Sequence, residues 1–217
     1  MKEKLNRKSA FVTRTLTTAI LFCLLFLISC AGTKPVAGNT GQDTVSPEVH
    51  AAFYAIRAAQ YVKNGDFNNA IIDLKKCVSV APASEKTDYE NLLGLAYGTR
   101  GIFYYKNGSY DNAISDLTKT VQLVSASKKT VYEKLLGKSY GDRGAYKGMN
   151  GYIDGGISDI KTCLRYIQDN KDRIKYKQAL GILYVAKGDI LSFQGDKDGA
   201  KENYLKAVLY NLSAISN

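Results

Sequence analysis

The chain has 217 residues, of which 45% are hydrophobic and 23% are charged, and its formal net charge at pH 7 is +10. Residues 1–29 hold five basic residues and one acidic residue, so the rest of the chain carries 25 basic and 19 acidic residues, a net charge of +6. This mild excess is spread along the sequence and forms no basic run, which argues against a nucleic-acid partner and agrees only weakly with an acidic partner or a membrane surface.

The amino terminus has the pattern of an export signal. Basic residues precede an apolar run over residues 16–28, which is shorter than the roughly 20 residues that a membrane-spanning helix needs. The run ends in Leu-Ile-Ser-Cys, and this tail resembles the lipobox of bacterial lipoproteins. The resemblance implies a signal peptide over residues 1–29 and an acylated Cys30 as the first residue of the mature protein. An ordinary signal peptide cleaved near Ala31 and an uncleaved anchor are the alternatives.

Residues 30–45 are expected to form a flexible tether between the lipid and a folded domain. They are rich in Gly, Thr, Ala and Asn and show no hydrophobic periodicity. The residue after Cys30 is Ala31, not the aspartate that retains some bacterial lipoproteins in the inner membrane. The resemblance therefore favours the periplasmic side of the outer membrane over the inner membrane.

A short pattern recurs four times after the tether. A tyrosine is followed four residues later by a small residue and seven residues after that by a glycine, and successive units are 43, 43 and 44 residues apart. The four copies are Tyr54, Ala58 and Gly65; Tyr97, Gly101 and Gly108; Tyr140, Gly144 and Gly151; and Tyr184, Gly188 and Gly195. Such a period is typical of a supersecondary unit that is copied and stacked. The sequence therefore predicts a helical repeat domain over residues 46–217.

Helix-start signals recur with the same period. Thr87 precedes Glu90 by three residues, the spacing of a capping box, and the third unit repeats this device 43 residues later. Ser46 followed by Pro47 marks an earlier start. Each first helix is expected to end at the glycine of its pattern, with a second helix directly after it. These signals predict helix pairs over residues 46–82, 87–125, 130–168 and 172–216.

Arginine and aspartate also recur together. Arg57, Arg100 and Arg143 are each followed sixteen residues later by an aspartate, whereas the fourth unit replaces both residues, with Lys187 and Asn203. Because the two positions change together, we expect an ion pair between the two helices of a repeat, in a structural role.

The chain resembles the tetratricopeptide repeat over residues 47–216. The resemblance is carried by Tyr97, Gly101, Tyr104, Gly108-Ser109-Tyr110, Ala113-Ile114 and Leu117, with Pro82 after the first unit. The period is longer than the usual ~34 residues. The resemblance implies an all-α fold, a right-handed α-solenoid of about four helix-turn-helix pairs, in which the first helices line a concave groove.

Within such a groove, the candidate contact residues are those on the first helices that the packing pattern leaves over. They are Lys63, Tyr105, Lys106, Asp142, Met149 and Phe193. The aromatic and methionine side chains would grip apolar groups of a partner, and the lysines would favour acidic neighbours. The alternative is that the aromatic residues belong to the core between repeats.

The last helix is expected to present an apolar face. Tyr204, Leu205, Val208 and Leu212 share that face, and no further unit of the pattern follows to cover it. A partner or self-association through this terminal helix would cover it.

No residue pattern typical of an enzyme is found. His50 is the only histidine and has no partner at metal or catalytic-triad spacing, and phosphate-binding and dinucleotide-binding motifs are absent from the sequence. We therefore expect no catalytic residue, cofactor or metal. Cys77 and Cys163, at equivalent repeat positions, are expected to be buried thiols and not a disulfide.

These observations predict a membrane-anchored lipoprotein scaffold that binds another protein through its repeats. By resemblance, it would serve as an assembly factor or adaptor for a complex of the bacterial cell envelope. One alternative is an accessory partner of a transport system that holds a soluble substrate-binding protein or ligand. Another, less favoured, is an envelope enzyme.

Overall fold

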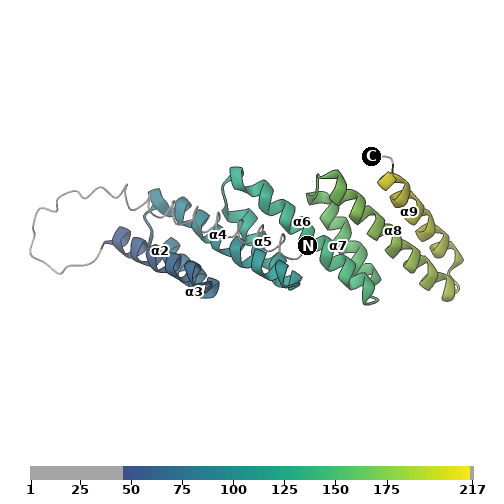
Figure 1. The fold of residues 1–217 in the computed structure, drawn as a ribbon, viewed down its shortest axis with the longest axis horizontal. Coiled ribbons are helices and arrows are strands. Elements are labelled where there is room, and N and C mark those ends of the chain that lie inside the picture. The colour runs from purple at the N-terminus through teal and green to yellow at the C-terminus, as the bar shows by residue number, and fades with distance from the viewer. Residues whose placement is uncertain (1–45, 216–217) are drawn as a thin grey trace, which may run out of the picture. The chain divides into compact units, whose positions relative to one another are not determined.

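The computed structural model describes residues 46–215, and all the regular structure in that range is α-helical. The helices are α2 (Pro47–Lys63), α3 (Phe67–Val80), α4 (Ala83–Lys106), α5 (Tyr110–Leu123), α6 (Ala126–Met149), α7 (Ile153–Tyr166), α8 (Asn170–Phe193) and α9 (Lys197–Ile215) (Figure 1). The predicted all-α helical repeat fold is confirmed over this range. The predicted signal peptide, Cys30 and the tether lie outside the described residues.

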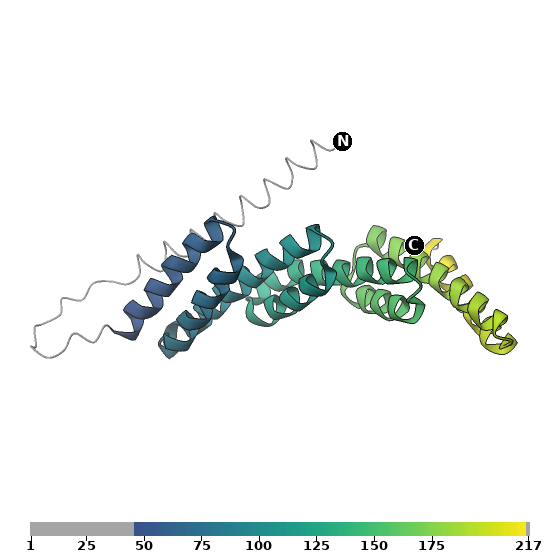
Figure 2. The ribbon, with the colours of Figure 1, turned by 90° about the horizontal axis from the view of Figure 1, so that it is seen from below.

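The helices belong to two compact units. Within the described range, unit 1 comprises residues 46–99 and 122–125, and unit 2 comprises residues 100–121 and 126–215. In unit 1, α2 and α3 pack side by side (Figure 2). In unit 2, α6 packs on α7 and α8 packs on α9, while α7 also packs on α8.

A glycine with a positive φ angle joins the two helices of each pair. The φ angles of Gly65, Gly108, Gly151 and Gly195 are 77°, 73°, 81° and 87°. Side chains other than glycine rarely adopt this left-handed conformation, which turns the chain sharply at the end of a helix. The predicted ends of the four first helices are confirmed.

The starts predicted for the first helices of the second and third repeats were wrong by four residues. Helix α4 begins at Ala83, so Thr87 and Glu90 lie inside it, and α6 begins at Ala126. The carbonyl of Pro82 accepts the first helical hydrogen bonds of α4, from the backbone N–H groups of Glu85 and Lys86, both at 3.0 Å. A helix continues toward its amino end until the backbone can no longer extend it, and proline is such a point. In α4 the capping-box spacing is met, but Pro82 sets the boundary.

Small residues allow the helices of a pair to approach closely. In unit 2, a Cβ atom added to Gly144 would lie 2.7 Å from Cγ1 of Ile160 and 2.9 Å from the carbonyl oxygen of Gly156. Helices α6 and α7 therefore approach closely at positions 144 and 156. In the last pair, a Cβ atom added to Gly188 would meet the ring of Tyr204.

The predicted arginine–aspartate bridges are present in three helix pairs. Nε and Nη2 of Arg57 donate to Asp73 at 2.5 and 2.7 Å, those of Arg100 to Asp116 at 2.7 and 2.8 Å, and those of Arg143 to Asp159 at 2.7 Å each. Each bridge joins the first helix of a pair to the second, in the two-pronged geometry that a guanidinium and a carboxylate favour.

Candidate functional site

The last residue of each first helix stands at the same repeat position. These residues are Lys63, Lys106, Met149 and Phe193. A lysine at the end of a helix interacts favourably with the helix dipole, but methionine and phenylalanine gain nothing there. Yet the relative exposure of Met149 is 80% and that of Phe193 is 95%. Both belong to unit 2, so this unit presents two exposed apolar side chains at the ends of α6 and α8.

Two other predicted groove residues, Tyr105 and Asp142, contact each other in unit 2. The Tyr105 hydroxyl donates to Oδ2 of Asp142 at 2.6 Å. Oδ1 of Asp142 accepts from Nζ of Lys175 at 2.9 Å and from the hydroxyl of Tyr176 at 3.0 Å. These four residues, the Asp142 cluster, tie the end of α4 to the middle of α6 and the start of α8.

The electrostatics of the Asp142 cluster fix its protonation state. Burial alone would raise the pKa of Asp142, but the hydrogen bonds from Tyr105, Lys175 and Tyr176 and the positive charge of Lys175 outweigh it, so the pKa is lowered. Burial and the bond to Asp142 raise the pKa of Tyr105, and burial with the nearby negative charge raises the pKa of Tyr176. At neutral pH Asp142 is therefore a carboxylate that accepts hydrogen bonds from three side chains, an arrangement suited to joining helices.

Sequence reasoning missed Lys175 and Tyr176. A signal for Tyr176 does exist, because Tyr89, Tyr132 and Tyr176 recur 43 and 44 residues apart and all three are buried. No such signal marks Asp142, since Thr99 and Ala186 stand at its position in the neighbouring repeats. Tyr105 and Asp142 thus form part of the packing between repeats. Lys63, Lys106, Met149 and Phe193 are exposed.

Two ion pairs in unit 2 join a first helix to the second helix of the preceding repeat. Nη1 of Arg143 donates to Oδ1 of Asp111 at 2.5 Å, and Nζ of Lys187 donates to Oδ1 of Asp154 at 2.5 Å. In both, a basic residue on a first helix reaches an aspartate in the first turn of the preceding second helix. Lys187 has no aspartate sixteen residues later, so it forms no bridge within its own repeat. It still forms the ion pair with the preceding repeat.

The contact between the third and fourth repeats also contains an inserted side chain. Leu183 of α8 lies against two glycines of the preceding repeat: a Cβ atom on Gly156 would be 2.9 Å from its Cδ1, and one on Gly148 would clash with its Cδ2. The absence of side chains at these glycines makes the space that Leu183 fills.

The terminal helix α9 is exposed on its apolar side, as predicted. Tyr204, Leu205, Val208 and Leu212 are all exposed, and Leu209, which was not singled out, joins them. A hollow of about 310 Å³ lies between the end of α8 and α9. Its lining residues are Ser192, Lys197, Ala200, Lys201, Tyr204, Leu205 and Val208.

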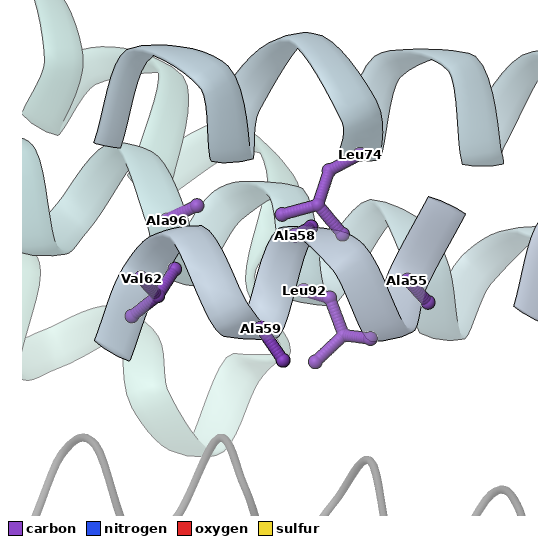
Figure 3. Close-up of a pocket in the computed structure, with 7 residues that line it drawn as sticks. All are labelled: Ala55, Ala58, Ala59, Val62, Leu74, Leu92 and Ala96. Atoms are coloured by element: carbon purple, nitrogen blue, oxygen red, sulfur yellow. The ribbon is translucent and has the colours of Figure 1, made fainter. Parts of the chain in front are cut away.

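Unit 1 contains a small apolar void between its helices. It has a volume of about 10 Å³ and is lined by Ala55, Ala58, Ala59, Val62, Leu74, Leu92 and Ala96, which come from α2, α3 and α4 (Figure 3). A water molecule needs about this much room and at least two polar partners. The void is therefore a packing gap and not a ligand site.

His50 is exposed at the start of α2. Over residues 46–215, no group of three or more His, Cys, Asp or Glu side chains is placed to hold a metal ion. In the same range, none of the helices combines the length and the apolar character that crossing a bilayer requires. Cys77 and Cys163 are free and buried, and Sγ of Cys77 donates to the carbonyl of Ala51 at 3.2 Å.

Comparisons with known proteins identify tetratricopeptide repeats at two places. Residues 51–84 and 182–213 match the tetratricopeptide repeat family model. The first segment spans most of α2 and all of α3, and the second spans the latter half of α8 and most of α9. No curated protein matches the chain.

Among solved structures, the chain is similar to several of MamA. A crystal structure of MamA shows 19% identity and a TM-score of 0.27, and covers 77% of this chain and 81% of its own. The MamA RS-1 ArsTM double mutant shows 20% identity and a TM-score of 0.31, covering 96% and 97%. MamA MSR-1 C2 shows 17% identity and a TM-score of 0.25, covering 76% and 99%. Because these TM-scores are low, the repeat assignment rests on the matched segments and the helix pairs.

Proposed function

We propose that this protein is a lipid-anchored scaffold that binds another protein through its helical repeats and acts as an assembly factor or adaptor in the bacterial cell envelope. The observation that carries this proposal is the exposure of Met149 and Phe193 at one repeat position of unit 2. Stacked helical repeats offer extended binding surfaces, and exposed apolar side chains on them are natural anchors for a partner.

The energetics favour a partner at these two side chains. Fully burying a methionine or phenylalanine side chain contributes about 1.5–3 kcal/mol. Lysine occupies the same position in the first two repeats, so the fold does not require an apolar residue there. The apolar side chains of Met149 and Phe193 are therefore available to bind a partner.

The carboxylates at the helix contacts serve the structure, which supports a scaffold. Asp73, Asp116 and Asp159 each bind an arginine, and Asp142 binds two tyrosines and a lysine. A catalytic acid or base requires a pKa tuned toward the working pH. The pKa values of Asp142 and Asp159 are instead lowered, in spite of burial, by their hydrogen-bond donors.

The partner is tested by crosslinking in native membranes followed by affinity purification. Met149→Lys with Phe193→Lys places in unit 2 the residue that the first two repeats carry, so the fold should be retained. We expect the main crosslinked protein to be lost. Val131→Lys, another exposed apolar position of α6, is the matched control and should keep it. A partner that survives the double variant would contradict the proposal, and a soluble substrate-binding protein as the partner would favour a transport accessory.

The anchor is proposed to be a lipid on Cys30, with the protein on the periplasmic side of the outer membrane. The basis is the lipobox-like sequence at residues 27–30 and the absence of aspartate at position 31. Growth with a fatty acid that carries a clickable tag should label the wild-type protein, and Cys30→Ala should abolish the label. Fractionation of the two membranes then tests the location. An unlabelled wild-type protein would contradict the anchor.

A further inference from the structure

A contact between successive repeats has two sides, one from a first helix and one from the preceding second helix. The exposed face of α2 corresponds to the first-helix side, and the exposed face of α9 corresponds to the second-helix side. On α2, Val49, Phe53 and Ile56 are exposed. At the same positions in the second repeat, Leu92, Ala96 and Thr99 are buried. The first repeat thus presents to solvent an apolar face of the kind that later repeats bury.

Both parts of the internal contact, the inserted side chain of Leu183 and the space that it fills, have counterparts in the first and last repeats. Phe53 stands at the repeat position of Leu183, and its relative exposure is 56%. Ser192 and Ala200 stand at the positions of Gly148 and Gly156, the two glycines that Leu183 contacts, and both line the hollow of about 310 Å³ beside α9. Unit 1 therefore carries the exposed side chain, and unit 2 carries the space that such a side chain fills.

The charges at the two ends match as well. Arg57 stands at the position of Arg143 and Lys187, and exposed Asp198 stands at the position of Asp111 and Asp154. Arg57 uses Nε and Nη2 for Asp73, so its Nη1 corresponds to the nitrogen with which Arg143 reaches Asp111. The side chain of Arg57 is 41% exposed.

We propose that a second copy of this chain stacks head to tail on the first, with its α2 docked on α9. Phe53 of one copy fills the hollow between α8 and α9 of the other, and Arg57 pairs with Asp198. The contact joins two different surfaces, so each copy keeps one free end and assembly can continue beyond a dimer. This proposal is independent of the partner proposed at Met149 and Phe193.

The stacked contact is weaker than the contact between repeats inside the chain. Lys197 and Lys201 stand where the preceding repeat has Ile153 and Ile157. Their charges make this end of α9 more polar than an internal second helix, and charged side chains are disfavoured at the centre of an interface. The assembly is therefore reversible and depends on protein concentration.

The test measures the mass of the purified full chain in detergent by analytical ultracentrifugation over a wide range of concentration. The wild-type mass should rise with concentration. Phe53→Ala removes the inserted side chain and Ser192→Leu fills the hollow, so each variant alone should stay monomeric. Both residues are exposed, and circular dichroism checks that the variants fold. Phe103→Ala, an exposed phenylalanine of α4, and Ser192→Ala, which leaves the hollow open, are the matched controls and should assemble as the wild type does.

Mixing the two variants distinguishes this contact from a symmetric one. The Phe53→Ala copy keeps an intact hollow and the Ser192→Leu copy keeps an intact Phe53, so their mixture should form dimers and nothing larger. Asp198→Lys should weaken the wild-type association by about two- to fivefold, the range expected for an exposed ion pair. A wild-type chain that stays monomeric, a single variant that still assembles, or a mixture that stays monomeric would each overturn the proposal.

Discussion

The same arginine–aspartate bridge occurs in both units, but its surroundings differ. In unit 1, the side chain of Arg57 is 41% exposed and lies over the rings of Phe53 and Tyr54. In unit 2, the side chain of Arg143 is only 18% exposed and binds Asp111 as well, while Asp159 also accepts from Lys147 at 2.9 Å. A repeated motif therefore has the same geometry at each site and a different energetic role, since water screens the first bridge and a network surrounds the second.

The largest effect is expected from breaking the bridge between Arg143 and Asp159 in unit 2. Asp159→Ala would leave Arg143 and Lys147 without their common partner in a largely buried place, and should lower the free energy of unfolding by about 3 kcal/mol. Asp73→Ala in unit 1 should cost clearly less, because water can solvate Arg57. Urea unfolding of both variants checks the order, and equal losses would show that burial does not distinguish the bridges.

A second prediction concerns the closest helix approach in unit 2. Gly144→Leu would push a side chain against Ile160 and the backbone of Gly156, and overpacking of this kind costs about 2 kcal/mol. Ala58, the equivalent residue of unit 1, already carries a Cβ atom, so Ala58→Gly is the complementary change and should cost less. Thermal unfolding of the two variants compares them. A neutral Gly144→Leu would mean that α6 and α7 can separate freely.

A third prediction isolates one bond of the Asp142 cluster. Tyr105→Phe removes the hydroxyl that donates to Asp142 and leaves the ring in place, so the loss should be about 1 kcal/mol. Tyr104→Phe on the same helix is a suitable control, and urea unfolding measures both. If the two variants lose the same stability, the bond between Tyr105 and Asp142 does not hold α4 to α6.

The smallest expected effect is a dependence on pH. The folded pKa values of Asp142 and Asp159 are lowered, so the folded state binds fewer protons than the unfolded state. Their contribution to stability is fully present above the unfolded pKa, about 3.9, and is lost as pH falls from there through the lowered folded values. Asp142→Asn should make this decline shallower. Urea midpoints between about pH 5 and pH 2 test this, and an unchanged slope would exclude Asp142 as a contributor.

Features that depend on residues close in sequence were predicted well. The glycine turns and the arginine–aspartate bridges follow from short spacings that recur once per repeat, such as the sixteen residues between Arg100 and Asp116. The start of α4 was wrong because a capping box and a proline competed, and proline set the boundary.

Features that depend on contacts between repeats were harder to predict. Tyr105 and Asp142 were both singled out, but their contact spans 37 residues and depends on how each helix is rotated. Lys175 lies 33 residues from Asp142, and Asp142 itself has no equivalent in the other repeats. A periodic pattern cannot reveal a residue that departs from the period.

Among residues 46–215, each unit contains one buried free cysteine, Cys77 in unit 1 and Cys163 in unit 2. Burial raises the pKa of both thiols to about 12, so neither reacts readily while the structure around it stays closed. An alkylating reagent would reach each thiol only when its surroundings open transiently. Each unit thus carries its own probe of local opening. The alkylation rates of the two thiols would report how often the surroundings of each one open under native conditions.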